Sequence, residues 1–322
     1  THMLAGTAYA KPMTAEKELT YTVQPGGRMN GRIRVPGDKS ISHRSIMLGS
    51  IAEGVTEVSG FLEGEDALAT LQAFRDMGVV IEGPERGRVR VHGVGLHGLK
   101  PAPGPLYVGN SGTSMRLLSG ILSAQPFDTV MTGDASLTKR PMERIAKPLR
   151  LMGADIQTTG ERGTPPVSVH GASTAAKGGL KGIHYDMPVA SAQVKSGVLL
   201  AGLWADGETS VTEPAPTRDH TERMLKGFGY EVSVQGATAS LRGGGKLTAT
   251  KIDVPSDISS AAFFLVAASI APNSDLTLEH VGINPTRVGV INILKAMGGN
   301  LEVFNEREIG GEPVADIRVR SA

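Results

Sequence analysis

The feature that most constrains the fold is a pair of short sequence patterns, each of which returns four times along the 322-residue chain. The first pattern is a helix end, a glycine and a strand start, and it reads "FRDMGVVIE", "LRLMGADIQ", "LKGFGYEVS" and "LKAMGGNLE". Its glycines are Gly78, Gly153, Gly229 and Gly298, and each stands where a helix commonly ends in a left-handed residue. Their spacing of roughly 70 residues is too long for the common solenoid repeats.

The second pattern is a strand, a polar turn and an apolar helix, and one example precedes each glycine. It reads "IRVPGDKSISHRSIMLGSIA", "LYVGNSGTSMRLLSGILSA", "YDMPVASAQVKSGVLLAGL" and "IDVPSDISSAAFFLVAASIA". Each unit is therefore strand–helix–strand–helix–strand, often with a further strand, and the units start near residues 33, 105, 184 and 252. This alternation predicts an α/β fold with helices covering the sheets. We expect three units to close one domain and the fourth to open another.

Composition excludes several classes of function. The formal net charge is only +1, which indicates neither nucleic acid nor a membrane surface as partner. The chain has no cysteine, so disulfides, Cys-ligated metals and a thiol nucleophile are excluded. The longest apolar run, residues 261–271, is too short to span a bilayer, and no secretory signal peptide is visible. We therefore expect a cytoplasmic protein.

The turns that lead into the first helix of each unit contain the candidate binding residues. They read "GDKSISHR", "GNSGTSMR", "VASAQVKS" and "SDISSAAF", and the first three are rich in hydroxyl, amide and cationic side chains. Helix capping by Ser, Thr and Asn explains part of this composition, and Ser40 or Ser42 is the expected cap of the first helix. For Lys39 and Arg44, a solvated charged helix end is one interpretation. The other is an anion pocket, because helix N-termini and converging cations both favour negative charge.

A second turn in units two and three adds two arginines. Arg140 precedes Pro141, which we expect at the first position of a helix, and Arg218 is similarly placed in "EPAPTRDHTERML". Taken singly, each arginine is also compatible with an ordinary surface ion pair, and Asp219 is the expected partner of Arg218.

Four segments together resemble one family: "PGDKSISHRSIMLGSIAEG", "GNSGTSMRLLSGIL", "DASLTKRPM" and "PVASAQVKSGVLLAGL". They are similar to 5-enolpyruvylshikimate-3-phosphate (EPSP) synthases, and the match runs from about residue 22 to the end. The resemblance implies inside-out α/β barrel domains built from repeated βαβαββ units, three to a domain. The first residues, "THM", look like the remainder of a tag, and we expect a tag and leader at 1–18. The resemblance predicts a first strand region at 19–34 that packs with the second domain, a three-repeat shikimate-3-phosphate-binding domain at 35–250, and the first repeat of the second domain at 251–322, with the C-terminal two repeats missing.

The resemblance also implies a reaction. An enolpyruvyl group passes from phosphoenolpyruvate to the 5-hydroxyl of shikimate-3-phosphate by addition–elimination between the two domains, and phosphate is released. This step belongs to the shikimate pathway of aromatic amino-acid biosynthesis. No cofactor or metal is expected, the partners are the two substrates, glyphosate is the expected inhibitor, and the protein is expected to be a monomer.

The family's functional residues transfer to matching positions of this chain. Lys39 is the catalytic residue and touches both substrates. The remaining shikimate-3-phosphate ligands are Ser40, Arg44, Ser191, Gln193 and Arg218. The phosphoenolpyruvate ligands are Asn110, Gly112, Arg140 and again Lys39 and Gln193, with Thr113 nearby. Ala192 stands where some relatives have a second serine.

Two alternatives remain open at this point. The family's general base, a Lys–Glu pair and two further arginines belong to the missing repeats, so a non-catalytic phosphate-binding fragment or pseudoenzyme is the first alternative, and we expect the 322-residue chain not to turn over. The second is a UDP-N-acetylglucosamine enolpyruvyl transferase. That relative usually carries a cysteine near "GDASLTKRP", and this chain has none, so we favour it less.

Overall fold

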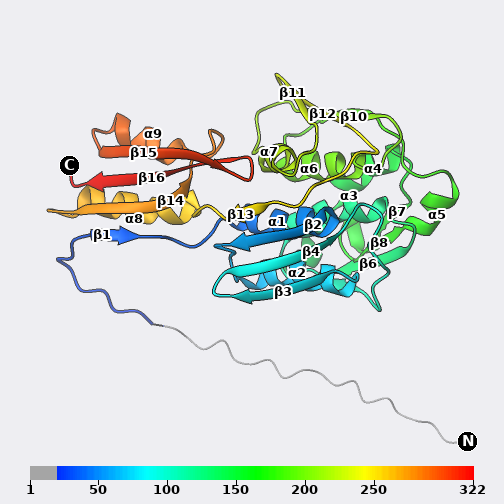
Figure 1. Ribbon diagram of the computed structural model, residues 1–322, viewed down its shortest axis with the longest axis horizontal. Helices are drawn as coiled ribbons and strands as arrows, with labels where there is room; N and C mark the ends of the chain where they lie inside the picture. Colours follow the sequence, from blue (N-terminus) through cyan, green and yellow to red (C-terminus); the bar gives the residue numbers. More distant parts are fainter. Residues whose placement is uncertain (1–19) are drawn as a thin grey trace, which may run out of the picture.

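The computed structural model describes residues 20–322, and it forms a larger and a smaller lobe (Figure 1). The first unit contains β1 (Asn30–Ile33), α1 (Lys39–Ile51), β2 (Glu53–Ser59), α2 (Glu65–Asp76), β3 (Val80–Glu85) and β4 (Arg88–Val94). The second contains β5 (Leu106–Tyr107), α3 (Gly112–Ser123), β6 (Asp128–Thr132), α4 (Glu143–Leu151), β7 (Ile156–Thr158) and β8 (Val167–His170). A short helix, α5 (Gly171–Ala176), links it to the third unit.

The third unit contains β9 (His184–Asp186), α6 (Ala192–Gly202), β10 (Glu208–Thr212), α7 (His220–Gly227), β11 (Ser233–Gln235) and β12 (Thr238–Arg242). The fourth contains β13 (Lys251–Asp253), α8 (Ile258–Ile270), β14 (Asp275–Gly282), α9 (Gly289–Ala296), β15 (Asn300–Ile309) and β16 (Glu312–Arg320). The predicted βαβαββ unit is therefore confirmed four times. The capping glycines are confirmed too, because Gly78, Gly153, Gly229 and Gly298 all have φ between +78° and +99° directly after a helix.

The sheets share one topology, and the first and fourth units exchange a strand. The four orders are β13-β2-β4-β3, β5-β6-β8-β7, β9-β10-β12-β11 and β1-β14-β16-β15, with the first pair parallel and the others antiparallel. Strand β1 thus lies in the smaller lobe beside β14, while β13 lies in the larger lobe beside β2 (Figure 1). Because β13 spans 251–253, the chain crosses to the smaller lobe just after it, and not at residue 250.

The two crossings of the chain between the lobes run past each other. They are residues 34–38 and 254–257, the two copies of the Val-Pro-x-Asp sequence. The amide of Asp38 donates to the carbonyl of Pro255 at 2.7 Å, and the amide of Asp257 donates to the carbonyl of Pro36 at 2.9 Å. The junction is therefore symmetrical, and it lies directly before helices α1 and α8.

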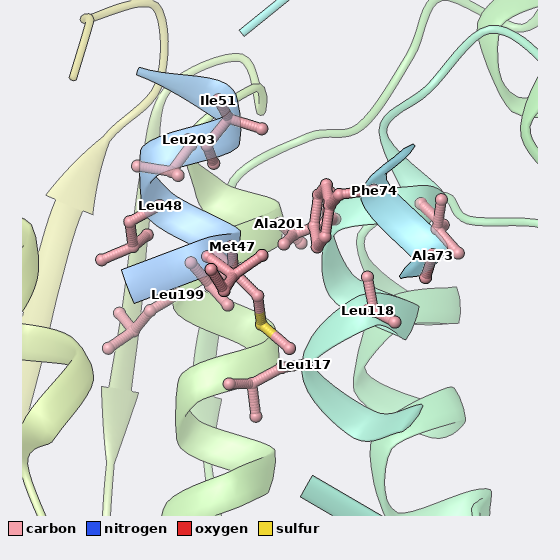
Figure 2. Close-up of a cluster of buried hydrophobic side chains, with 14 of the residues drawn as sticks. Met47, Leu48, Ile51, Ala73, Phe74, Leu117, Leu118, Leu199, Ala201 and Leu203 are labelled. Atoms are coloured by element: carbon pink, nitrogen blue, oxygen red, sulfur yellow. The ribbon is translucent and has the colours of Figure 1, made fainter. Parts of the chain in front are cut away.

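Helices α1, α3 and α6 form the centre of the larger lobe, with the sheets outside them. Every residue from 41 to 51 of α1 and from 194 to 202 of α6 is buried, and polar residues such as His43, Arg44 and Lys195 are buried with the apolar ones. Figure 2 shows Met47 and Leu48 of α1 packed with Leu117 of α3 and Leu199 of α6. Helices α3 and α6 approach closely because both carry glycine at the contact. A Cβ on Gly120 would lie 2.1 Å from a backbone oxygen of α6.

The apolar helix α8 of the smaller lobe is covered on one side only. Ala261, Leu265 and Ala268 are fully buried, whereas Phe263 is 78% and Ile270 76% exposed. Across residues 20–322, no helix combines the length and the apolar character that crossing a bilayer requires.

Two details of the predicted helix starts were wrong. Asp38, and not Ser40 or Ser42, caps α1, and its Oδ1 accepts from the amide of Ile41 at 2.9 Å. A carboxylate suits this position because it accepts from a free amide and complements the helix dipole. Helix α4 begins at Glu143, so Pro141 lies before the N-cap residue and not at the first helical position.

Candidate active site

A cleft of about 270 Å³ collects residues from the leading turns of the first three units. Its lining consists of Ser40, Arg44, Thr113, Ser191, Ala192, Gln193, Arg218 and His220. Five of the six residues expected to bind shikimate-3-phosphate line this one cleft, and Lys39 is the exception. The near three-fold arrangement of the units therefore brings together turns that are far apart in the sequence.

Arg44 gives the cleft its charge. Its side chain is 5% exposed. The guanidinium donates to Thr221 Oγ1 at 2.8 Å, to the carbonyl of Ser40 at 3.0 Å and to Ser196 Oγ at 3.3 Å. All three partners are neutral, and within residues 20–322 no carboxylate forms an ion pair with Arg44. Burial lowers the pKa of Arg44 to about 10, so the group is still charged near neutral pH. A buried cation with only neutral partners favours an anion beside it.

Gln193 connects this cleft with a second cluster of cations. Its Oε1 accepts from the guanidinium of Arg116, and its Nε2 donates to Thr113 Oγ1 at 2.8 Å. Ser191, two residues earlier, caps α6 by accepting from the amide of Val194 at 3.2 Å. Ser191 is thus both a helix cap and part of the cleft lining, and Gln193 stands between two positively charged subsites.

The second subsite contains Arg116 and Arg140. Arg140 donates to Asn110 Oδ1 at 2.9 Å, and Asn110 in turn donates to the carboxylate of Asp134 at 2.9 Å. Burial, followed by the positive charge of Arg140, lowers the pKa of Arg116. Two guanidinium groups that repel each other in a partly buried place are stabilised by an anion between them.

Gly112 lies where these guanidinium groups need space. It is the first residue of α3, and a Cβ built on it would lie 2.9 Å from Arg116 Nη1 and 3.1 Å from Arg140 Nη1. Its φ is not in the left-handed region, in contrast to Gly109 with φ of +62°. A side chain at 112 would therefore displace the guanidinium groups, whereas the turn itself does not need glycine there.

Lys39 does not line the cleft and is held by a carboxylate. Its Nζ is 2.5 Å from Asp66 Oδ2, and its side chain is 52% exposed. The other oxygen of Asp66 accepts from the amide of Asn110 at 3.3 Å. Lys39 is thus tied, through Asp66, to the turn that contains Asn110 and Gly112.

Arg218 lies exposed at the rim of the cleft, without the partner expected from the sequence. Asp219 instead pairs with Arg223 at 2.9 Å and accepts from Asn284 at 2.7 Å. Partial burial and the neighbouring Arg287 lower the pKa of Arg218. Arg218 therefore remains available to a ligand.

Sequence reasoning missed Arg287, which joins the two crossings. Its guanidinium lies 3.1 Å from Asp38 and 3.4 Å from Asp257, the N-cap residues of α1 and α8, and donates to Ser259 Oγ at 2.9 Å. A signal was present, because "PTR" occurs both at 216–218 and at 285–287, in equivalent turns of units three and four. Over the described range, no three His, Cys, Asp or Glu side chains form a group that would hold a metal ion.

A sequence model of the family described as EPSP synthase (3-phosphoshikimate 1-carboxyvinyltransferase) matches residues 23–322. The chain belongs to the EPSP synthase family. A protein of Methylococcus capsulatus named 3-phosphoshikimate 1-carboxyvinyltransferase is 67% identical over 95% of this chain and 68% of its own length. A namesake from Alkalilimnicola ehrlichii is 64% identical over 94% of this chain and 67% of its own length.

Solved structures of family members confirm the inside-out α/β fold. An EPSP synthase from Acinetobacter baumannii superimposes with a TM-score of 0.88 at 71% identity, over 92% of this chain and 65% of that chain. The chain thus spans about two thirds of the length of these EPSP synthases.

Proposed function

We propose that the protein acts in the transfer of the enolpyruvyl group from phosphoenolpyruvate to the 5-hydroxyl of shikimate-3-phosphate, with release of phosphate. One observation carries the proposal. Arg44 is a buried, charged guanidinium with only neutral partners, and it lines a cleft whose other residues are hydroxyls, an amide and a second arginine. Such a lining fits a ligand that combines phosphate with hydroxyl groups.

The cleft is the proposed shikimate-3-phosphate site. Ser40 and Ser191 offer hydroxyls, Gln193 offers an amide, and Arg44 and Arg218 offer guanidinium groups. Arg44 supplies a charge that is fixed before the ligand arrives, since three hydrogen bonds hold it. Arg218 is exposed and adapts to the ligand. Fixed charges in a partly dry cleft bind anions more strongly than solvated ones.

The arginine cluster is the proposed phosphoenolpyruvate subsite. Arg140 and Asn110 are already bonded to each other, and Gly112 leaves space beside both arginines. Gln193 links this subsite to the first, so the two substrates lie side by side. Glyphosate, a small anion with phosphonate and carboxylate groups, is the proposed competitor for the same place.

These residues stabilise the charge that develops during the reaction. The 5-hydroxyl adds across the enolpyruvyl double bond: it loses its proton, its oxygen bonds to C2, and C3 gains a proton. Elimination then removes a proton from C3, restores the double bond and breaks the bond from C2 to the phosphate oxygen, so that negative charge builds on the departing phosphate. Arginine and lysine side chains fixed around that phosphate lower the barrier because they need little rearrangement. Lys39 contributes after it leaves Asp66 and binds the substrates. It is the first residue of α1, directly after the crossing at 34–38, which is bonded to the crossing at 254–257.

Titration calorimetry with three ligands tests the proposal. Shikimate-3-phosphate should bind, shikimate should bind at least about 10-fold more weakly because it lacks the charge-assisted bonds of the phosphate, and phosphoenolpyruvate or glyphosate should bind better once shikimate-3-phosphate is present. Equal affinity for shikimate and its phosphate would contradict the assignment. Phosphate release with both substrates separates an active transferase from the non-catalytic alternative, which predicts binding without turnover.

Two finer properties belong to the same proposal. We propose that the protein acts in the cytoplasm and as a monomer, supported by its family and its balanced charge. Sedimentation analysis tests the second point, and the exposed apolar side of α8 makes that measurement informative.

A further inference from the structure

The two lobes also meet through a buried polar contact beside the cleft. His220 is the first residue of α7 in the larger lobe, it lines the cleft, and it is 3% exposed. Glu312 is the first residue of β16 in the smaller lobe and is 2% exposed. His220 Nδ1 lies 2.7 Å from Glu312 Oε1. One wall of the cleft is therefore bonded directly to the other lobe.

Further bonds fix the geometry of this pair. The imidazole and the carboxyl group share one hydrogen bond, between Nδ1 and Oε1. Glu312 Oε2 accepts from Asn284 Nδ2 at 3.2 Å, and the same amide donates to Asp219 Oδ1 at 2.7 Å. Within residues 20–322, the buried Nε2 of His220 has no hydrogen-bond partner. The smaller lobe thus holds both Asp219 and His220 at the start of α7.

Backbone packing fixes Glu312 relative to α7. The tip of the β15–β16 hairpin lies so close to the helix that a Cβ on Gly311 would be 2.1 Å from the carbonyl of Arg223. A Cβ on Gly227 would be 2.4 Å from the carbonyl of Gly310. The hairpin therefore contacts the helix backbone to backbone, and its position is transmitted to α7 without a flexible side chain between them.

The next residue of α7 holds the cation of the cleft. Thr221 Oγ1 accepts from Arg44 Nε at 2.8 Å and donates to Ser196 Oγ at 2.8 Å. Glu312, His220, Thr221 and Arg44 thus form a continuous connection from the smaller lobe to the guanidinium. Any shift of the first turn of α7 moves the acceptor on which Arg44 depends.

We propose that His220 is a positioning residue through which the smaller lobe, by way of Glu312, sets the place of Arg44 in the cleft. The inference rests on the proposed function only in taking a phosphorylated ligand as the occupant of the cleft. It assigns a role in ligand affinity to Glu312, a residue of the other lobe that does not line the cleft.

The test is calorimetric titration of shikimate-3-phosphate, and separately of inorganic phosphate, into the full chain and three variants. Glu312→Gln keeps the shape but removes the charge, and should weaken binding about tenfold, within the range known for residues that couple two sites. Glu306→Gln is the matched control, because it removes an exposed carboxylate from the same hairpin, and should change affinity less than twofold. His220→Asn, whose amide can still donate to Glu312, should retain more affinity than Glu312→Gln.

Each outcome decides between the two proposals. Equal affinities of Glu312→Gln and Glu306→Gln, with tight binding by the unchanged protein, would overturn the inference and leave the proposed function standing. Binding of phosphate but not of shikimate-3-phosphate, with the predicted effect of Glu312→Gln on phosphate affinity, would overturn the proposed function and leave the inference standing. Binding of neither ligand overturns both.

Should a variant fail to fold, nitrogen NMR of the His220 ring in the unchanged protein decides instead. A proton on Nδ1, together with a ring signal that moves when phosphate is added, supports the proposal. A proton on Nε2 alone, or a ring that does not respond to saturating phosphate, overturns it.

Discussion

Replacing Gly112 with alanine should weaken phosphoenolpyruvate binding without lowering the stability of the fold. The new methyl group would lie 2.9 Å from Arg116 Nη1 and 3.1 Å from Arg140 Nη1, both tighter than nearly all real Cβ contacts. Both neighbours are the far ends of flexible side chains, so they move by a few tenths of an ångström and the backbone stays in place. The fold tolerates this, but the guanidinium groups lose their alignment toward an anion.

The substitution should weaken ligand binding but slightly raise the free energy of unfolding. Partial loss of one charge-assisted hydrogen bond, worth about 1.5–3 kcal/mol when complete, should raise the dissociation constant of phosphoenolpyruvate about tenfold. Binding of glyphosate should weaken by a similar factor if glyphosate occupies the same subsite. Gly112 has an ordinary φ at a helix start, so alanine should raise the free energy of unfolding by up to about 0.5–1 kcal/mol, since it restricts the unfolded chain.

Gly109→Ala is the matched control in the same turn. Gly109 has φ of +62° and its nearest neighbour would be 3.4 Å from the new methyl group, so alanine there should cost about 1–2 kcal/mol of stability through backbone strain. The assays are titration of phosphoenolpyruvate into protein saturated with shikimate-3-phosphate, and urea unfolding. If Gly112→Ala lost stability like Gly109→Ala and kept its ligand affinities, the close approach of the arginines would not be the reason for glycine at 112.

Other predictions concern stability, its dependence on pH, and the exposed apolar side of α8. Burial, followed by the nearby charge of Arg44, lowers the pKa of His43 to about 4, so its contribution to stability is complete above pH 6.5 and is lost as the pH falls toward 4. Between about pH 7 and pH 5, the free energy of unfolding of the unchanged protein should therefore fall by about 2 kcal/mol more than that of His43→Gln. Equal falls in the two proteins, measured by urea unfolding, would refute this. Gly120→Ala should cost about 2 kcal/mol or more in the same assay, because its Cβ would meet the carbonyl of Gly197 at 2.1 Å, and an unchanged midpoint would contradict that contact. Phe263→Ser combined with Ile270→Ser should reduce binding of a hydrophobic dye without loss of stability, since both side chains are more than three-quarters exposed, and a large drop in melting temperature would show that they are covered.

The sequence predicted the local structure well because its signals are local. A helix that ends in a left-handed residue favours glycine there, and the four capping glycines indicate the length and phase of the units from the sequence alone. The meeting of the polar turns followed from the same phase, since equivalent turns of similar units meet when the units pack around one centre. Six of the eight residues that line the cleft lie at this one repeated position, whereas Arg218 and His220 lie in another turn.

What the sequence did not predict depends on contacts between distant segments. Ser40 and Ser42 look like caps of α1, but Asp38 takes that role and also pairs with Arg287, 249 residues away. His220 and Glu312 are ordinary polar residues 92 positions apart, and only the docking of the hairpin on α7 makes them partners. Single-sequence reasoning weighs neighbours in the chain, so a polar bond between lobes leaves no pattern that it can detect.

We propose that the cleft around Arg44 binds shikimate-3-phosphate, and a crystal structure of the protein grown with this ligand is the decisive measurement. One ligand should lie in this cleft, with polar atoms within hydrogen-bond distance of Arg44 and Gln193, and Lys39 should leave Asp66 and turn toward the ligand. A ligand bound elsewhere, or a cleft that stays without ligand at saturating concentration while Arg44 keeps the same three neutral partners, would contradict it.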